Sequence, residues 1–309
     1  MFPFLKLIRY KNLLIIALTQ CLMTTIFGFT SEINYWNFVL LVLSTVLIAA
    51  AGYIINDYFD VEIDKINKPE RVIIDNFISK KTAMQLYLFL NGVGLFIGIS
   101  LCSKMGFWQL SSIFILWIIL FYFYSTIFKK KFLIGNLIVA FVIATYPLII
   151  TVFFYEYVFW PLFINAIIGV SLFAFLITLL REIVKDIEDY EGDKNFGCKT
   201  IPIVLGINKT KIIVVIIALL IVSSILIFIE KPLLNQYVFN PINHILYLLF
   251  TVQVPLLFFV YKVIVAKEKR EYEFLSNLLK IVMITGILFL LLVFTDLGTI
   301  LSNIGAQPI

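Results

Sequence analysis

The sequence predicts an all-α polytopic membrane protein. Of its 309 residues, 62% are hydrophobic and only 14% are charged, a composition too apolar for an ordinary soluble domain. The apolar residues are gathered into repeated runs of roughly 18 to 22 residues, the length that spans a bilayer as a helix. These runs are continuously apolar rather than alternating, which excludes a transmembrane β-barrel.

Breaks at charged residues, Pro, Gly and Asn divide the apolar sequence into about nine predicted spans. They cover residues 12–29, 36–55, 82–102, 107–127, 132–153, 158–180, 211–229, 243–265 and 275–300. The first run lacks a small-x-small cleavage site, so we interpret it as a retained span rather than a signal peptide. No linker or soluble domain interrupts the series. We therefore expect residues 1–309 to form a single domain, one helical bundle around a central cavity.

The positions of the basic residues predict the orientation, because basic loops stay on the cytoplasmic side. All but two of the 24 Lys and Arg residues fall in the N-terminal segment or after even-numbered spans, the exceptions being Lys104 and Lys231. This pattern predicts a cytoplasmic N-terminus, in the cell membrane if the source is prokaryotic. The net charge of +5 restates the asymmetry and gives no reason to expect a nucleic-acid partner.

Cysteine and histidine chemistry is disfavoured by the sequence. The three cysteines, Cys21, Cys102 and Cys198, are too few and too scattered for a disulfide framework or a metal knuckle. The only histidine, His244, has no Cys or His neighbour at ligand spacing, so we expect it to be structural.

One acidic pattern occurs twice, each time where an apolar run meets a polar loop. The pattern is Asp-x-x-Asp-x-x-x-Asp-Lys, and its aspartates are Asp57, Asp60 and Asp64 in the first copy and Asp186, Asp189 and Asp193 in the second. On a helix, positions i, i+3 and i+7 fall within roughly 60° of one another, so each triplet should project from one face. The loops concerned, about 56–81 and 181–210, both follow even-numbered spans. The triplets are thus expected to face each other across one cavity at the cytoplasmic side.

Two sets of carboxylates near helix C-termini favour bound divalent cations, because the helix macrodipole and mutual repulsion both oppose their negative charge. Oxygen ligands without His or thiolate suit a hard ion such as Mg²⁺, which shares its remaining positions with water and phosphate oxygens. A substrate diphosphate is the simplest source of those oxygens. The alternative is that the acids are solvated helix ends paired with nearby lysines, which are Lys65, Lys68, Lys185 and Lys194.

At these residues the chain resembles the UbiA superfamily of intramembrane prenyltransferases. Residues 56–64, NDYFDVEID, match its NDxxDxxxD motif without a mismatch. Residues 181–193, REIVKDIEDYEGD, followed by KTIP at 199–202, resemble the second aspartate motif in the form typical of the digeranylgeranylglyceryl phosphate synthase branch. The resemblance implies Mg²⁺-dependent transfer of a polyprenyl group from an allylic diphosphate, such as geranylgeranyl diphosphate, to a lipophilic acceptor.

Smaller matches support the resemblance. Residues 9–12, RYKN, resemble R-P-x-N with Tyr10 in place of proline, and Tyr124-Ser125 before Lys129-Lys130 resembles Y-S-x-x-x-K-[KR]. Residues 67–73, NKPERVI, resemble N-x-P-x-R-P-I, although Val72 replaces the second proline. The resemblance implies that all six aspartates are metal-binding and catalytic. It also implies a set of substrate-binding residues, namely Asn56, Lys68, Arg71, Tyr124, Ser125, Lys129, Lys130, Arg9 and Asn12.

Several alternatives stay open at this point. The second motif favours a prenylated glycerol phosphate as acceptor, while an aromatic, quinone-precursor type of acceptor and an intramolecular cyclisation are also possible. From another class, a cation-coupled membrane transporter also places acidic residues at broken helices. Against a transporter, the acids gather at one face rather than at the bilayer midplane, and basic residues surround them. Prenyl chain length and oligomeric state are not determined by the sequence.

Overall fold

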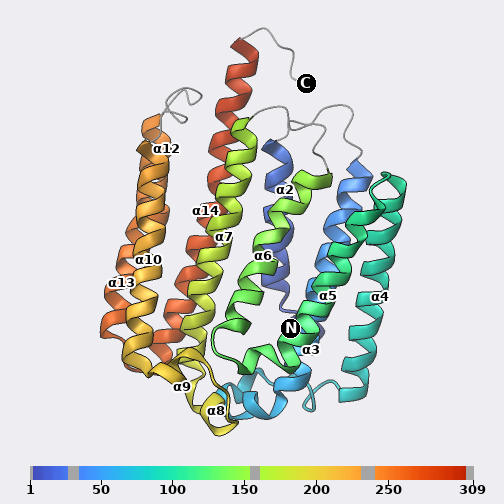
Figure 1. The fold of residues 1–309 in the computed structure, drawn as a ribbon, viewed down its shortest axis with the longest axis vertical. Helices are drawn as coiled ribbons and strands as arrows, with labels where there is room; N and C mark the ends of the chain where they lie inside the picture. Colours follow the sequence, from blue (N-terminus) through green and yellow to red (C-terminus); the bar gives the residue numbers. More distant parts are fainter. Residues whose placement is uncertain (1–2, 27–34, 154–160, 231–240, 304–309) are drawn as a thin grey trace. The chain divides into compact units, whose positions relative to one another are not determined.

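The computed structural model describes residues 3–26, 35–153, 161–230 and 241–303, which are helical with short connections (Figure 1). Eight of its helices are long and apolar enough to cross a membrane, and a shorter apolar helix covers Tyr10–Met23. The prediction of an all-α, multi-pass protein is therefore confirmed. The predicted span ends at 27–29 and 158–160, and the exceptional Lys231, lie outside the described residues. The cytoplasmic position of the N-terminus stays a prediction.

The chain is divided into two compact units. The first comprises Met1–Leu18, Asn34–Val142 and Asp189–Ile203, and the second comprises Thr19–Ile33, Ile143–Glu188 and Val204–Ile309. The expected single domain and central cavity stay predictions. Five of the six motif aspartates belong to the first unit, which therefore carries most of the candidate site.

The first unit is built on one long helix with two others against it. Its elements are α1 (Pro3–Leu7), the start of α2 (Tyr10–Ile26), α3 (Tyr35–Asn67), the 3-10 turn η1 (Pro69–Arg71), α4 (Lys80–Lys104), η2 (Trp108–Leu110), α5 (Ser111–Thr126), η3 (Phe128–Lys130), the start of α6 (Ile134–Phe153), α8 (Tyr190–Asn195) and the start of α9 (Ile201–Leu205). Small residues let α4 approach α3 closely: the Ser44 hydroxyl donates to the Gly94 carbonyl at 2.7 Å. Such close approach through Gly and Ser is the usual basis of helix packing in membranes.

Helix α3 is longer than the predicted span 36–55, because it continues through the first acidic motif to Asn67. Hydropathy ends the predicted span at the first polar residues, yet Asp, Glu and Lys do not break helices. The first breaker is Pro69, whose ring disfavours the helical conformation in the residue before it. The first motif is thus helical rather than part of a loop starting at 56.

Gly98 is expected to be essential for the packing of α4. A Cβ at this position would lie 2.8 Å from Phe114 Cδ2 and 2.9 Å from Ser44 Oγ, whereas a Cβ at Gly92 on the same helix would meet nothing within 4 Å. We expect Gly98→Ala to lower the free energy of unfolding by about 1 to 3 kcal/mol, the usual cost of overpacking. Gly92→Ala should be neutral or stabilising, since alanine has the higher helix propensity. Thermal unfolding of both variants in detergent tests this, and equal midpoints would contradict it.

The second unit contains the remaining long helices. They are α7 (Pro161–Glu188), α10 (Ile207–Glu230), α12 (Pro241–Leu248), the π-helical turn η5 (Leu249–Gln253), α13 (Val254–Val265) and α14 (Lys269–Asn303). Pro255 has no N–H to give to the carbonyl of Thr251 four residues earlier. The Thr285 hydroxyl of α14 donates to that carbonyl at 2.9 Å instead. The helix irregularity is therefore compensated by a contact with α14.

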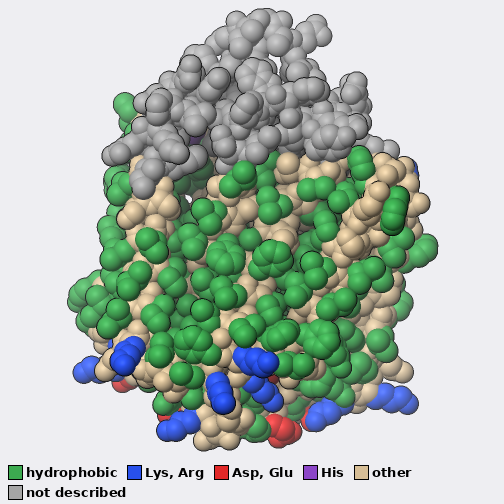
Figure 2. Space-filling view, viewed as in Figure 1, with side chains coloured by type: hydrophobic (Ala, Val, Ile, Leu, Met, Phe, Trp, Pro, Cys, Tyr) green, Lys and Arg blue, Asp and Glu red, His purple; other side chains and the backbone are tan. Residues whose placement is uncertain are grey.

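The surroundings of His244 and of the exposed hydrophobic side chains agree with what the sequence predicts. His244 is 2% exposed and its ring packs edge-to-face on Phe289 at 5.5 Å, which agrees with the structural role expected for it. Large hydrophobic side chains such as Trp36 and Phe96 are more than 70% exposed. Figure 2 shows hydrophobic side chains covering the helix surfaces, and Lys and Arg side chains at helix ends. An apolar outer surface of this kind fits a lipid environment.

Candidate active site

The first acidic motif lies on the last turns of α3. Asp57, Asp60 and Asp64 share this uninterrupted helix, as the spacing predicts. Asp60 is the most buried, at 3% exposed, while the other two are partly exposed. The motif therefore presents its carboxylates at the boundary between the packed helices and the connecting segments.

The second motif does not lie on one helix, which corrects the expectation of a shared face. Helix α7 ends at Glu188, Asp189 has φ −97° and ψ 11°, and α8 begins at Tyr190. Asp186 belongs to the second unit, whereas Asp189 and Asp193 belong to the first. The periodicity argument assumed an uninterrupted helix, and tertiary contacts of the segment after Glu188 with the first unit accompany the break.

Two hydrogen bonds hold this segment in the first unit. The Gly192 N–H donates to Asn67 Oδ1 at 2.9 Å, and the Lys199 N–H donates to the Lys130 carbonyl at 2.8 Å. Asn67 is the last residue of α3, and Lys130 is in η3. Asp189 and Asp193 are thereby brought to the end of α3 that carries the first motif.

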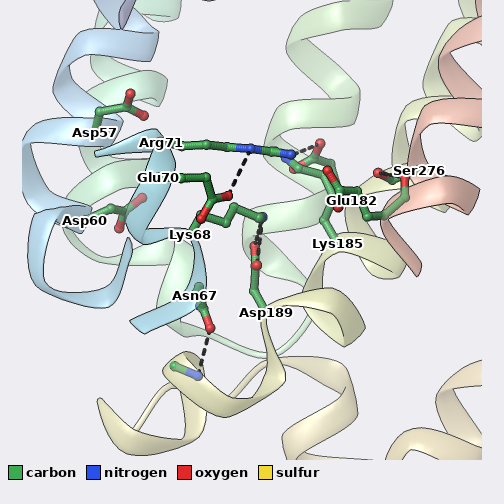
Figure 3. Close-up of polar contacts among 12 residues, drawn as sticks. Asp57, Asp60, Asn67, Lys68, Glu70, Arg71, Glu182, Lys185, Asp189 and Ser276 are labelled. Atoms are coloured by element: carbon green, nitrogen blue, oxygen red, sulfur yellow. Dashed lines mark hydrogen bonds and ion pairs between the residues drawn. The ribbon is translucent and has the colours of Figure 1, made fainter. Parts of the chain in front are cut away.

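Three basic side chains each contact one motif aspartate. Arg9 Nη2 lies 2.7 Å from Asp57 Oδ1, Lys68 Nζ lies 2.7 Å from both carboxylate oxygens of Asp189, and Lys129 Nζ contacts Asp60 Oδ2. Figure 3 shows Lys68 directed at Asp189. The three cations come from different parts of the first unit, so several segments converge on the same carboxylates.

Arg9 occupies the junction between α1 and α2. Its backbone φ is +50°, the left-handed region that residues other than glycine rarely adopt. Its guanidinium carbon lies 5.1 Å from the centre of the Tyr53 ring, a cation–π contact beside the ion pair with Asp57. Backbone strain of this kind persists only where surrounding contacts enforce it, and it is concentrated at functional sites.

The cluster carries excess negative charge. Its five aspartates outnumber the three cations that contact them in the described part of the chain, so two carboxylate charges are not balanced by these cations when all five are ionised. Burial, with Asp189 and Asp60 nearby, raises the pKa of Asp193 to about 7. Burial would lower the pKa of Lys129, but Asp60 and Asp64 outweigh it and the pKa lies well above its usual value. The site thus favours an additional cation.

The other predicted substrate-binding residues in the first unit have varied surroundings. Asn56 Oδ1 is buried and has no hydrogen-bond partner in the described part of the chain. Tyr124 is close enough to Lys129 to influence its pKa. Ser125 is 3% exposed, and its hydroxyl donates to the Phe121 carbonyl of its own helix at 2.9 Å. Of these residues, Asn56 is the one whose buried side-chain oxygen accepts no hydrogen bond in the described part of the chain.

The remaining three predicted residues are Arg71, Lys130 and Asn12. Arg71 is exposed, with Nε 3.7 Å from Glu70 Oε1. Lys130 is exposed too, and its carbonyl accepts the hydrogen bond from Lys199. The Asn12 N–H donates to the Arg9 carbonyl at 2.8 Å, which fixes the start of α2. Their roles as substrate contacts stay predictions.

The donors present suit a hard cation in their chemistry. All are carboxylate or amide oxygens, which are the ligands that hard cations prefer, and burial raises the pKa of Asp193 among them to about 7. Within residues 3–26, 35–153, 161–230 and 241–303, however, no three Asp, Glu, His or Cys side chains come together closely enough to hold a metal ion. Expecting Mg²⁺ here therefore rests on donor chemistry and charge rather than on a formed cluster.

Comparison with known proteins decides the family. The profile of the UbiA prenyltransferase family matches residues 17–284. The chain belongs to this family. The predicted family membership, and with it the prediction of an intramembrane prenyltransferase, is confirmed.

Relatives of this UbiA-family protein include two digeranylgeranylglyceryl phosphate synthases. The digeranylgeranylglyceryl phosphate synthase of Saccharolobus solfataricus is 36% identical over 300 residues, which cover 94% of this chain and 95% of that one. The enzyme of the same name from Ignicoccus hospitalis is 40% identical over 163 residues, 53% of this chain and 52% of the relative. That second match thus spans about half the length of each protein.

Solved structures of the family share the fold. A structure of digeranylgeranylglyceryl phosphate synthase matches with a TM-score of 0.61 and 25% identity, covering 95% of this chain and 98% of that one. A UbiA homologue from Archaeoglobus fulgidus, bound to DMAPP and Mg²⁺, matches with a TM-score of 0.60 and 17% identity over 96% of this chain and 99% of that one.

Proposed function

We propose that this UbiA-family protein transfers a geranylgeranyl-type group from its allylic diphosphate to a prenylated glycerol phosphate, in a Mg²⁺-dependent reaction. The observation that carries the proposal is the gathering of five motif aspartates and three cations in one unit of the chain. The acceptor follows from the relatives named digeranylgeranylglyceryl phosphate synthase, one of which matches over 95% of its length.

The aspartates are the proposed metal-binding and catalytic residues. Asp57, Asp60 and Asp64 on α3 would hold Mg²⁺ together with Asp189 and Asp193, and Asp186 completes the proposed set. Bound Mg²⁺ neutralises the charge that grows on the diphosphate as its bond to the allylic carbon breaks. Asn56, whose buried oxygen has no partner in the described part of the chain, is proposed to orient a ligand of this site.

The basic residues are the proposed diphosphate contacts. Arg9, Lys68 and Lys129 already lie among the carboxylates, so a diphosphate bound there meets both its counter-charges and its hydrogen-bond donors. Arg71, Lys130, Asn12, Tyr124 and Ser125 are proposed as outer members of the same surface. The allylic carbocation that forms requires protection from water, which the apolar packing of α3, α4 and α5 supplies.

The sidedness of the reaction is part of the proposal. Lys and Arg are concentrated after the even-numbered predicted spans, which supports a cytoplasmic N-terminus and a site that opens to the cytoplasmic face. The proposed partners are an isoprenyl diphosphate donor and the lipid bilayer in which the acceptor resides.

An acceptor panel tests the proposed function. The purified protein is incubated with labelled geranylgeranyl diphosphate and Mg²⁺, or with EDTA, and with geranylgeranylglyceryl phosphate, an aromatic acid, or no acceptor. We expect a doubly prenylated glycerol phosphate only when Mg²⁺ is present. A product on the aromatic acid alone would make the protein an aromatic prenyltransferase. Cation flux through proteoliposomes without any prenyl transfer would make it a transporter.

A further inference from the structure

We propose that Asn67 is a positioning residue, which caps α8 from the end of α3 and so keeps the Asp189 carboxylate available to the diphosphate site. The inference rests on the proposed function, because the importance of Asp189 follows from it. In the proposed site, Asn67 itself contacts neither the substrate nor the reacting atoms. It acts through the second acidic motif.

The contact is close and buried. Asn67 is 5% exposed, and its Oδ1 accepts the Gly192 N–H at 2.9 Å. A Cβ at Gly192 would lie only 2.4 to 2.5 Å from three atoms of the Asn67 carboxamide. The backbone φ of Gly192 is not positive, so glycine is required there by this close approach and not by a turn. Figure 3 shows the Asn67 side chain directed at this backbone nitrogen.

The hydrogen bond replaces an ordinary helix cap. The first N–H groups of a helix lack partners within it, and the side chain at the N-cap position usually accepts one from the second or third helical residue. In α8 the N-cap residue is Asp189 and the third residue is Gly192, yet the Asp189 side chain makes no capping bond. Asn67 accepts the Gly192 N–H in its place.

With Asn67 as the cap, Asp189 does not have to both cap α8 and interact with the charged groups of the site. Because Asn67 caps α8, the Asp189 carboxylate turns to Lys68, 2.7 Å away, among the other charged groups. Asn67 lies three residues after Asp64, and its partner Gly192 directly precedes Asp193, so this hydrogen bond joins the two motifs. A helix of six residues has little stability of its own. Its position therefore depends on contacts such as this one.

Removing the carboxamide should redirect Asp189. In Asn67→Ala the Gly192 N–H lacks its acceptor, and the nearest substitute is the Asp189 carboxylate in the usual capping position. We expect the Mg²⁺ concentration for half-maximal transfer to rise about tenfold, the lower end of the effect of outer-shell partners on metal affinity. The rate at saturating Mg²⁺ should largely recover. Asn67→Asp keeps a capping oxygen and should preserve the amide protection of α8.

The experiment compares Asn67→Ala with Asn76→Ala, a matched control whose carboxamide donates to the Val72 carbonyl within its own loop. Hydrogen exchange of the peptide covering residues 189–196 and the Mg²⁺ dependence of transfer are measured for both. Faster exchange confined to that peptide, with a raised Mg²⁺ requirement, is expected for Asn67→Ala only. In combination with Asp189→Ala, the Asn67→Ala change should add no further Mg²⁺ effect, since the carboxylate it redirects is already gone.

Three results would overturn the assignment. They are unchanged exchange in residues 189–196, a Mg²⁺ dependence equal to that of Asn76→Ala, and full additivity with Asp189→Ala. If Asn67→Ala does not fold, exchange in Asn67→Asp decides: wild-type protection of the peptide supports the cap, and lost protection contradicts it. Local exchange does not require turnover. A protein that shows the exchange effect but no transfer would therefore refute the proposed function and leave the cap standing.

Discussion

Replacing Asp60 with asparagine is expected to lower the rate of Mg²⁺-dependent prenyl transfer by about 10³, the scale of losing one preorganised electrostatic group in an active site. Asp60 is the most buried member of the first motif, at 3% exposed, and it contacts Lys129. The substitution keeps the size of the side chain and removes its charge. The loss should therefore appear in the catalytic rate and in the response to Mg²⁺ rather than in folding.

Glu62 provides the matched control within the same motif. It lies two residues further along α3, its side chain is 57% exposed, and its carboxylate forms an ion pair with Lys65 at 2.8 Å. Exposed pairs of this kind contribute little, so Glu62→Gln should change the rate by less than about twofold. Initial rates over a Mg²⁺ titration measure both variants. Equal rates for Asp60→Asn and Glu62→Gln would remove the first motif from the catalytic machinery.

The sequence predicted the helices well where apolarity and helix formation coincide. The predicted span 132–153 and helix α6 at Ile134–Phe153 differ by two residues at one end. The prediction of the span end failed at 56–67, although the motif spacing placed these aspartates on a helix, because hydropathy reports where a helix leaves the apolar phase and the helix itself ends only near Pro69. It failed similarly before residue 275, since α14 begins at Lys269, where Glu271 Oε2 accepts the N–H groups of Lys267 and Glu268.

The candidate site could be predicted only in part, because the sequence shows local spacing but not which distant residues meet. A repeated acidic pattern of fixed spacing is visible in the sequence, so it singles out six aspartates, five of which belong to one unit of the structure. The pairing of cations with them is not visible, because Lys68 and Asp189 are separated by 121 positions along the chain. Asn67 was missed as a functional residue. In the sequence, Asn67 stands out only as the first residue of the NKPERVI match. Its partner is a backbone N–H, which a pattern of side chains cannot reveal.

Lys129→Met is expected to make the stability of the protein depend on divalent cations. The side chain of Asp60 is 4% exposed and that of Lys129 is 27% exposed, so removing the ammonium leaves a buried carboxylate without its counter-charge. Breaking a buried pair costs about 3 to 5 kcal/mol. The partial exposure of Lys129 reduces that to about 2 kcal/mol, since solvent screens exposed charges. Thermal unfolding in detergent with EDTA should show the loss.

Addition of Mg²⁺ should restore much of this stability, because a divalent cation compensates the charge that Lys129 no longer balances. The stabilisation by Mg²⁺ should thus be larger in Lys129→Met than in the wild type. Lys131→Met is the control: Lys131 is exposed and its ammonium lies 5.5 Å from the centre of the Phe128 ring. A Lys129→Met variant that unfolds like the control, with and without Mg²⁺, would show that Lys129 does not balance the aspartate charges. Transfer should still fall in Lys129→Met, because a cation that stabilises the fold does not replace a donor to the diphosphate.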